Sequence, residues 1–135
     1  MAIANRRESI YVAQIRRCLS IKRHATSREL LIACREKYPS VSFTTIHRVV
    51  QRMIDDGELA LAPMSPDGER RVDINVLPHD HFECSECGYL KDIRLPGQIY
   101  ETIDNELGGC HLDGPLLIKG NCHSCLNEGG KNGCY

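Results

Sequence analysis

Four cysteines in the C-terminal half of this 135-residue chain have the spacing of metal ligands. Cys84 and Cys87 are separated by two residues, and so are Cys122 and Cys125. A tight turn brings the two sulfur atoms of such a pair to one ion, and four thiolates close a tetrahedral zinc site that has no open position for catalysis. The two pairs therefore predict one structural zinc per chain.

Two histidines just before the first cysteine pair suggest a second metal. His79 and His81 are separated by one residue, and alternate residues of an extended strand point to the same side. The pair can therefore share an ion held by nitrogen and oxygen ligands, which would differ from the zinc.

The length suits one ordinary domain or two small ones, and two small ones would each have a thin core. Two Phe and no Trp leave little for a core, and a structural ion compensates because its binding free energy becomes folding free energy. The N-terminus lacks a secretory apolar run, and no segment approaches the ~18 apolar residues of a membrane span. We therefore expect a cytoplasmic protein with no membrane partner, where paired cysteines indicate metal rather than disulfides.

The net charge of −1 conceals an asymmetry between the two halves. Residues 1–77 carry 13 Lys and Arg against 9 Asp and Glu, whereas residues 78–135 carry 4 against 9. The N-terminal half could approach a phosphate backbone, and the C-terminal half could collect cations. Scattered solvated charge explains the same numbers equally well.

The first 76 residues have the pattern of three helices and a hairpin. Apolar spacing predicts a helix over 8–20, a capping box at 26–29 opens a second helix that Pro39 ends, and Ser42 and Gly57 bound a third. Strands are expected at 59–62 and 70–74, joined by a tight turn at 65–68. This order predicts a winged helix-turn-helix domain over residues 1–76.

The third helix has a polar face suited to the major groove of DNA. Opposite its apolar face it carries hydrogen-bonding side chains, namely Thr44, His47, Arg48 and Gln51, with Arg52 beside them. A three-helix module with a hairpin that binds another protein remains the alternative for this half.

Residues 77–135 are expected to form a small α/β dimerisation domain, so the whole chain is of the α+β class. The pattern predicts a strand at 90–95, a helix at 98–107 with Ile99, Ile103 and Leu107 buried, and a strand at 116–119. An exposed sheet edge in such a domain favours a homodimer.

With these motifs in this order, the chain resembles the ferric uptake regulator family of metal-dependent, dimeric winged-helix repressors. Residues 41–46, 56–57, 79–88 and 120–125 carry the resemblance. It implies a homodimer on a palindromic operator in double-stranded DNA, with no small-molecule substrate. We count Thr45 of this helix among the DNA contacts, and we expect Arg70 or Arg71 of the basic hairpin to lie near phosphate.

The resemblance further implies a regulatory Fe2+ or Mn2+ ion, one per chain, whose ligands match His24, Asp73, His79, His81 and Asp92. Nitrogen and carboxylate ligands suit these ions. Aspartate at both acidic positions is typical of the peroxide-sensing branch, where the residues matching His24 and His79 are oxidised and repression ends. The alternative is an iron- or manganese-responsive repressor of metal uptake without peroxide sensing.

The chain also departs from the family pattern. His47 replaces a usual tyrosine, and Gly114 and Pro78 stand where members with a third metal site have histidines, so no third site is expected. No third cysteine pair follows. Free thiols are expected at the remaining cysteines, with Cys134 exposed and Cys18, Cys34 and Cys110 buried, and we expect His111 and His123 to be structural or solvated.

Enzymatic readings fit less well. Zinc deaminases combine an H-x-E motif with a distant P-C-x-x-C, but here Cys84 follows Glu83 directly, and Asn121 rather than proline precedes Cys122. A thiol-disulfide oxidoreductase needs an exposed thiolate at a helix N-terminus, and neither pair is placed in that way. A zinc-ribbon interaction module would not need a basic helical half. We therefore expect a repressor rather than an enzyme.

Overall fold

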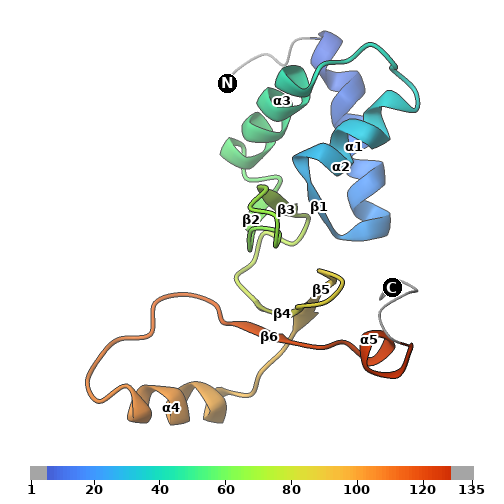
Figure 1. Ribbon diagram of the computed structural model, residues 1–135. Helices are drawn as coiled ribbons and strands as arrows, with labels where there is room; N and C mark the ends of the chain where they lie inside the picture. Colours follow the sequence, from blue (N-terminus) through green and yellow to red (C-terminus); the bar gives the residue numbers. More distant parts are fainter. Residues whose placement is uncertain (1–5, 129–135) are drawn as a thin grey trace. The chain divides into compact units, whose positions relative to one another are not determined.

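The computed structural model describes residues 6–128, and the chain divides into two compact units between Leu77 and Pro78 (Figure 1). Each unit is described by itself. Within the described residues, no helix is both long and apolar enough to cross a membrane.

Three helices form most of the first unit: α1 (Arg6–Lys22), α2 (Ser27–Arg35) and α3 (Phe43–Asp55). The predicted capping box is present, because the Glu29 N–H donates to Thr26 Oγ1 while the Glu29 carboxylate accepts from the Thr26 N–H. Ser42 caps α3 through the Thr45 N–H, and Gly57 follows α3 with a φ of +76°. The helix α2 ends at Arg35, three residues earlier than Pro39 suggested.

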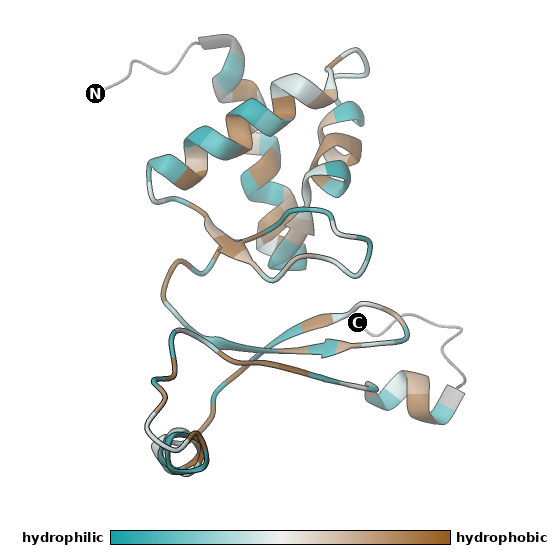
Figure 2. Cartoon of the chain, turned by 60° about the vertical axis from the view of Figure 1, so that its left-hand side comes forward, coloured by the Kyte–Doolittle hydropathy of each residue, from teal (hydrophilic) through white to brown (hydrophobic). Residues whose placement is uncertain are grey.

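The apolar faces of the three helices meet in one core. Figure 2 shows apolar and polar stretches alternating along them, as the sequence spacing predicts. The buried residues include Ile15 and Leu19 of α1, Leu30 and Cys34 of α2, and Ile46, Val49, Val50 and Met53 of α3. This core fixes the outward face of α3.

A three-stranded antiparallel sheet completes the first unit, with β1 (His24–Thr26), β2 (Ala60–Ala62) and β3 (Arg71–Asp73) in the order β1-β3-β2. The hairpin of β2 and β3 is the predicted wing, and the Gly68 N–H donates to the Ser65 carbonyl in its turn. The strand β1 was not expected. It pairs with β3 in a register that puts His24 opposite Asp73.

The second unit has a sheet of β4 (Asp80–Cys84), β5 (Leu90–Ile93) and β6 (Leu117–Gly120), together with α4 (Gly97–Glu106) and α5 (His123–Glu128). The strand β4 is central; it pairs antiparallel with β5 and parallel with β6. The parallel register places Cys84 opposite Gly120, so both cysteine pairs lie at one end of the sheet. Neither the parallel pairing nor α5 was predicted.

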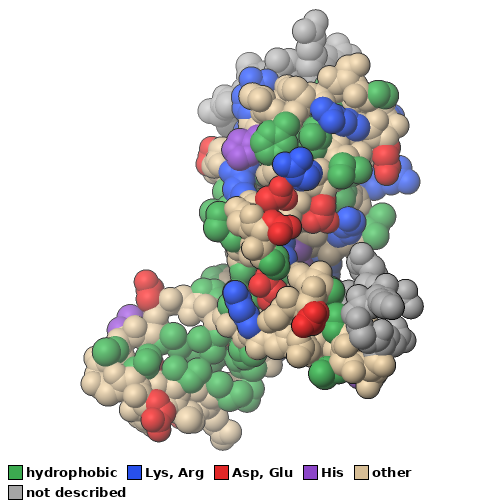
Figure 3. Space-filling view, in the orientation of Figure 1, with side chains coloured by type: hydrophobic (Ala, Val, Ile, Leu, Met, Phe, Trp, Pro, Cys, Tyr) green, Lys and Arg blue, Asp and Glu red, His purple; other side chains and the backbone are tan. Residues whose placement is uncertain are grey.

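The second unit has little core of its own. Cys84, Leu90 and Cys122 are its buried hydrophobic residues among those the structure describes. Our expectation that Ile99, Ile103 and Leu107 are buried is wrong, since Ile99 and Leu107 are 37% and 38% exposed and Ile103 is half-buried. Figure 2 shows α4 nearly end-on, apolar on one side, and Figure 3 shows an apolar surface at the lower left, where α4 lies.

Candidate metal centres and recognition helix

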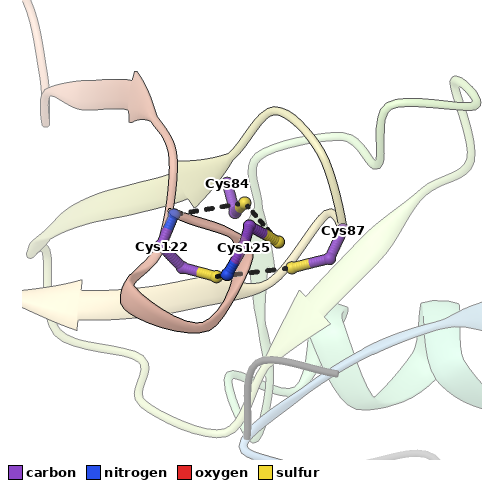
Figure 4. Close-up of side chains that lie close together, drawn as sticks. All are labelled: Cys84, Cys87, Cys122 and Cys125. Carbon is purple, nitrogen blue, oxygen red and sulfur yellow. Dashed lines mark hydrogen bonds between the residues drawn. The ribbon is translucent and has the colours of Figure 1, made fainter. Parts of the chain in front are cut away.

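The four cysteines converge at one end of the second sheet (Figure 4). Cys84 ends β4, Cys87 lies in the following turn, and Cys122 and Cys125 lie at the start of α5. The Gly88 N–H donates to the Cys84 carbonyl, and the φ of +76° at Gly88 lets the turn close. The sequence therefore folds locally so that each pair presents both sulfurs to the same point.

The distances between the sulfur atoms fit a zinc ion. Cys84 Sγ lies 3.6 Å from Cys125 Sγ, and Cys87 Sγ lies 3.9 Å from Cys122 Sγ. All four sulfurs lie within 4.8 Å of one another. A tetrahedron with Zn–S bonds of about 2.3 Å has edges of roughly 3.8 Å, so the cluster has the size that zinc requires.

Backbone N–H groups stabilise the thiolate form of Cys84. Burial raises the pKa of the Cys84 thiol, but hydrogen bonds from the Cys122, Cys87 and Glu86 N–H groups outweigh burial and lower it to about 6. Burial and the neighbouring thiols raise the pKa of Cys125 to about 12. Cys84 is therefore a ready thiolate ligand, whereas Cys125 needs a bound cation to stabilise its thiolate.

In the second unit, three nitrogen and oxygen ligands lie together: His79 just before β4, His81 on β4 and Asp92 on β5. His81 is opposite Asp92 in the antiparallel register, and its Nε2 lies 3.4 Å from Asp92 Oδ1. His79 Nε2 lies 3.1 Å from the same oxygen, and the two imidazole rings are 4.3 Å apart. Both histidines thus point to the same side, as the alternation of a strand predicts.

In the first unit, His24 and Asp73 form a second such group. Their positions are opposite each other on β1 and β3, and His24 Nε2 lies 3.1 Å from Asp73 Oδ2. Arg23 lies between α1 and β1. Its N–H donates to the Leu19 carbonyl at the end of α1, and its φ of 67° turns the chain into β1. The Asn75 N–H donates to Asp73 Oδ1 and holds that carboxylate in place.

The polar face of α3 is exposed where the sequence predicted it. Thr44, His47, Arg48 and Gln51 are exposed, and Thr45 and Arg52 are half-buried. The His47 ring stacks on Phe43, with 5.7 Å between the ring centroids. Arg70 of the wing donates to Gln51 Oε1 at 2.5 Å and lies 3.3 Å from His47 Nδ1, so the wing and α3 form one polar surface.

Arg71 does not have the role expected for it. It is buried, and its guanidinium donates to the carbonyls of Pro63 at 2.8 Å and Met64 at 3.1 Å. Successive strand residues point to opposite faces, so only one of the two wing arginines can lie against α3, and that one is Arg70. Arg71 instead holds the hairpin together.

The remaining cysteines and histidines are mostly where they were expected. Cys34 is buried, and burial raises the pKa of its thiol to about 11; burial also raises the pKa of the half-buried Cys18. Cys110 is exposed, which corrects our expectation, because it follows α4 outside any core. Cys134 lies outside the described residues. His111 and His123 are exposed, and His123 lies 3.1 Å from the side chain of Asn127.

Sequence reasoning missed three buried carboxylates, those of Glu8, Asp80 and Glu83. Asp80 lies between the two histidines, where it accepts hydrogen bonds from the Tyr100 hydroxyl and, at 2.8 Å, from the Leu116 N–H. Glu8 of α1 contacts two arginines of α3. A charged residue inside an apolar helical face was the signal that could have identified Glu8.

Comparison with known proteins places the chain in one family. The Ferric uptake regulator family matches residues 3–108. The peroxide-responsive repressor PerR of Staphylococcus epidermidis is 26% identical over 119 residues, which cover 87% of this chain and 79% of that protein.

Solved structures share the fold. An iron-bound ferric uptake regulator from Francisella tularensis has a TM-score of 0.70 at 17% identity, covering 94% of this chain and 97% of its own. A zinc-bound manganese uptake regulator has a TM-score of 0.66 at 24% identity, covering 90% and 91%. The chain therefore belongs to the Ferric uptake regulator family and is a metal-dependent, DNA-binding regulator of transcription.

Proposed function

We propose that this protein is a peroxide-responsive repressor that binds a palindromic DNA operator as a homodimer. The observation that carries the proposal is its set of nitrogen and oxygen ligands. His24 and Asp73 pair in the first unit, and His79, His81 and Asp92 gather in the second. Three imidazoles and two carboxylates suit Fe(II) or Mn(II), and thiolates are absent from the set.

The two ligand groups are proposed to share one ion. In each group an aspartate oxygen lies within 3.4 Å of an imidazole nitrogen, which orients the ring. Because one group precedes residue 77 and the other follows it, a shared ion would link the two units. A fixed arrangement of the units is what would let two copies of α3 meet successive major grooves of an operator.

The peroxide response is proposed to act on the histidines themselves. Bound Fe(II) would supply the redox chemistry that activates hydrogen peroxide, and the two electrons that reduce the peroxide would come in net from the imidazole ring. At His24 or His79, a ring carbon would exchange its C–H bond for a bond to one peroxide oxygen, and the other oxygen would leave as water. The modified imidazole would be a poorer ligand, so the link between the two units would be lost and the operator released. The similarity to PerR, a peroxide-responsive repressor, supports a response to peroxide.

Mass spectrometry tests the proposal directly. The full chain is loaded with Fe(II) or Mn(II) under anaerobic conditions, exposed to dilute peroxide and digested. We expect one added oxygen on the peptide that carries His24 or His79 in the Fe(II) sample, together with loss of DNA binding. The Mn(II) sample, whose ion does not readily mediate this redox chemistry, should remain unmodified and bind DNA.

The second candidate is an iron- or manganese-responsive repressor of metal uptake that does not sense peroxide. Structural similarity to the iron-bound and manganese-uptake regulators favours it. Under this alternative the histidines stay unmodified, and oxidation instead joins zinc-site thiols such as Cys84 and Cys87 in a disulfide with loss of zinc. The same digest therefore separates the two candidates.

The proposed DNA contacts come from α3 and the wing. Thr44, His47, Arg48 and Gln51 would face base edges, with Thr45, Arg52 and Arg70 beside them. His47→Ala and Arg48→Ala should change which sequences are selected from random DNA in the presence of Mn(II). If both variants selected the wild-type sequence with unchanged affinity, this placement of α3 would be wrong.

A further inference from the structure

Glu8 is a buried acidic residue in the first turn of α1. Its side chain is 8% exposed, yet it lies against the most basic part of α3. Its Oε1 accepts a hydrogen bond from Arg48 Nε at 3.2 Å, and its Oε2 accepts one from Arg52 Nη1. One carboxylate therefore engages two guanidinium groups from a helix 40 residues away in sequence.

The two arginines differ from Glu8 in their exposure. Arg48 and Arg52 are four residues apart, so they lie one turn apart on the same side of α3. Their side chains are 60% and 36% exposed, and they belong to the polar face proposed to meet DNA. The carboxylate thus lies behind the arginines, and it halves the positive charge that this turn of α3 presents to the solvent.

We infer that Glu8 weakens the sequence-independent affinity of α3 for DNA. Binding then depends more on the base contacts that the rest of the polar face makes. The inference rests on the proposed function, because it assumes that α3 meets DNA. A phosphate oxygen and the Glu8 carboxylate require the same guanidinium N–H groups. Each phosphate contact must therefore compete with a partner that is already in place.

The competition predicts a change in salt dependence. Neutralising one phosphate adds about −0.9 to the slope of log affinity against log salt. Suppose that Glu8→Gln frees one arginine per chain for a phosphate contact. Lowering the salt from 200 to 50 mM should then raise the affinity for random DNA about threefold more per chain in the variant than in the wild type. The ratio of operator affinity to random-DNA affinity should fall.

Glu58 provides a matched control. Glu58 Oε2 accepts from Arg16 Nη2 at 2.6 Å in the same unit, and neither residue belongs to α3. Glu58→Gln removes the same charge as Glu8→Gln but frees an arginine of α1. A general effect of net charge would therefore appear equally in both variants.

The experiment measures binding of the full, Mn(II)-loaded chain to random-sequence duplex and to a duplex selected by the wild type, across a range of salt. We expect a steeper slope and tighter random-DNA binding for Glu8→Gln than for Glu58→Gln. Adding Glu8→Gln to a chain that carries Arg48→Ala and Arg52→Ala should have no further effect, since the carboxylate acts through these arginines. Thermal melting by circular dichroism verifies that each variant is folded.

Three results would overturn the inference. They are equal slopes in the two glutamine variants, weaker random-DNA binding in Glu8→Gln, or a full Glu8→Gln effect in the chain that lacks both arginines. If Glu8→Gln failed to fold, Glu8→Asp in the otherwise wild-type chain, whose shorter side chain reaches Arg48 and Arg52 less well, would be compared with Glu58→Asp. A wild-type chain that bound neither duplex would refute the proposed function itself, and that outcome is distinct from the three above.

Discussion

Replacing Cys87 by serine should remove the zinc and unfold the second unit while the first unit stays folded. Cys87 Sγ lies 3.9 Å from Cys122 Sγ, and loss of one thiolate opens the closed ligand shell. The second unit cannot compensate, because among its described residues Leu90 is the one buried hydrophobic that is not a zinc ligand.

The structure sets the size of this effect. A fully buried leucine-sized side chain contributes about 1.5–3 kcal/mol to folding, whereas structural zinc contributes about 10–16 kcal/mol in zinc-finger peptides. The first unit, in contrast, buries apolar residues from all three of its helices. Loss of the zinc therefore exceeds the remaining apolar stabilisation of the second unit and leaves the first unit unaffected.

Two-dimensional amide NMR can follow the two units separately. For Cys87→Ser, we expect the signals of residues 78–128 to collapse into the unfolded region while those of α1, α2 and α3 keep their dispersion. Cys110→Ser is the matched control, because Cys110 is an exposed cysteine of the same unit outside the sulfur cluster. Its zinc content and spectrum should match those of the wild type.

The opposite result would refute the reasoning. A Cys87→Ser protein that bound no zinc but retained dispersed signals for β4, β5 and β6 would show that the second unit is stable without the ion. Collapse of both units together would show that the first unit depends on the second.

Three further predictions follow from hydrogen bonds in the structure. Thr26→Ala should lower the stability of the first unit by about 1 kcal/mol in denaturant unfolding, because the Glu29 N–H loses its cap. Arg71→Ala should destabilise the first unit in the same assay, rather than weaken DNA binding at unchanged stability, because its partners are backbone carbonyls of the wing. The hydrogen bond that Tyr100 donates to Asp80 raises the pKa of the Tyr100 hydroxyl. This hydrogen bond therefore stabilises the fold fully below the ordinary tyrosine pKa, and the stabilisation is lost as the pH rises through the raised value. Ultraviolet titration should show one late-ionising tyrosine that Tyr100→Phe removes.

The elements with strong local signals were predictable. Ser42 and Gly57 bound α3 because a side-chain cap and a left-handed glycine are local chemistry. The cysteine spacing predicted a cluster whose sulfurs do converge. These features depend on residues close together in the sequence, so no knowledge of the tertiary structure was needed.

Features that depend on distant pairing were not predictable. Strand β1 has three residues and no periodicity of its own, and it exists because β3 offers a free edge. The roles of Arg70 and Arg71 depend on which face of β3 each one occupies, which a shift of one residue would reverse. The burial of Ile99 was overestimated because helical spacing shows an apolar face but not what covers it.

The alternation along β4 constrains how this segment can evolve. His79 and His81 lie on one side of the chain with Asp92, while the Asp80 carboxylate between them is tied to Tyr100 and Leu116. Insertion or deletion of a single residue here would exchange the two sides and disrupt both sets of contacts at once. Descendants of this gene should therefore tolerate substitutions around the histidines more readily than any change in the length of the segment.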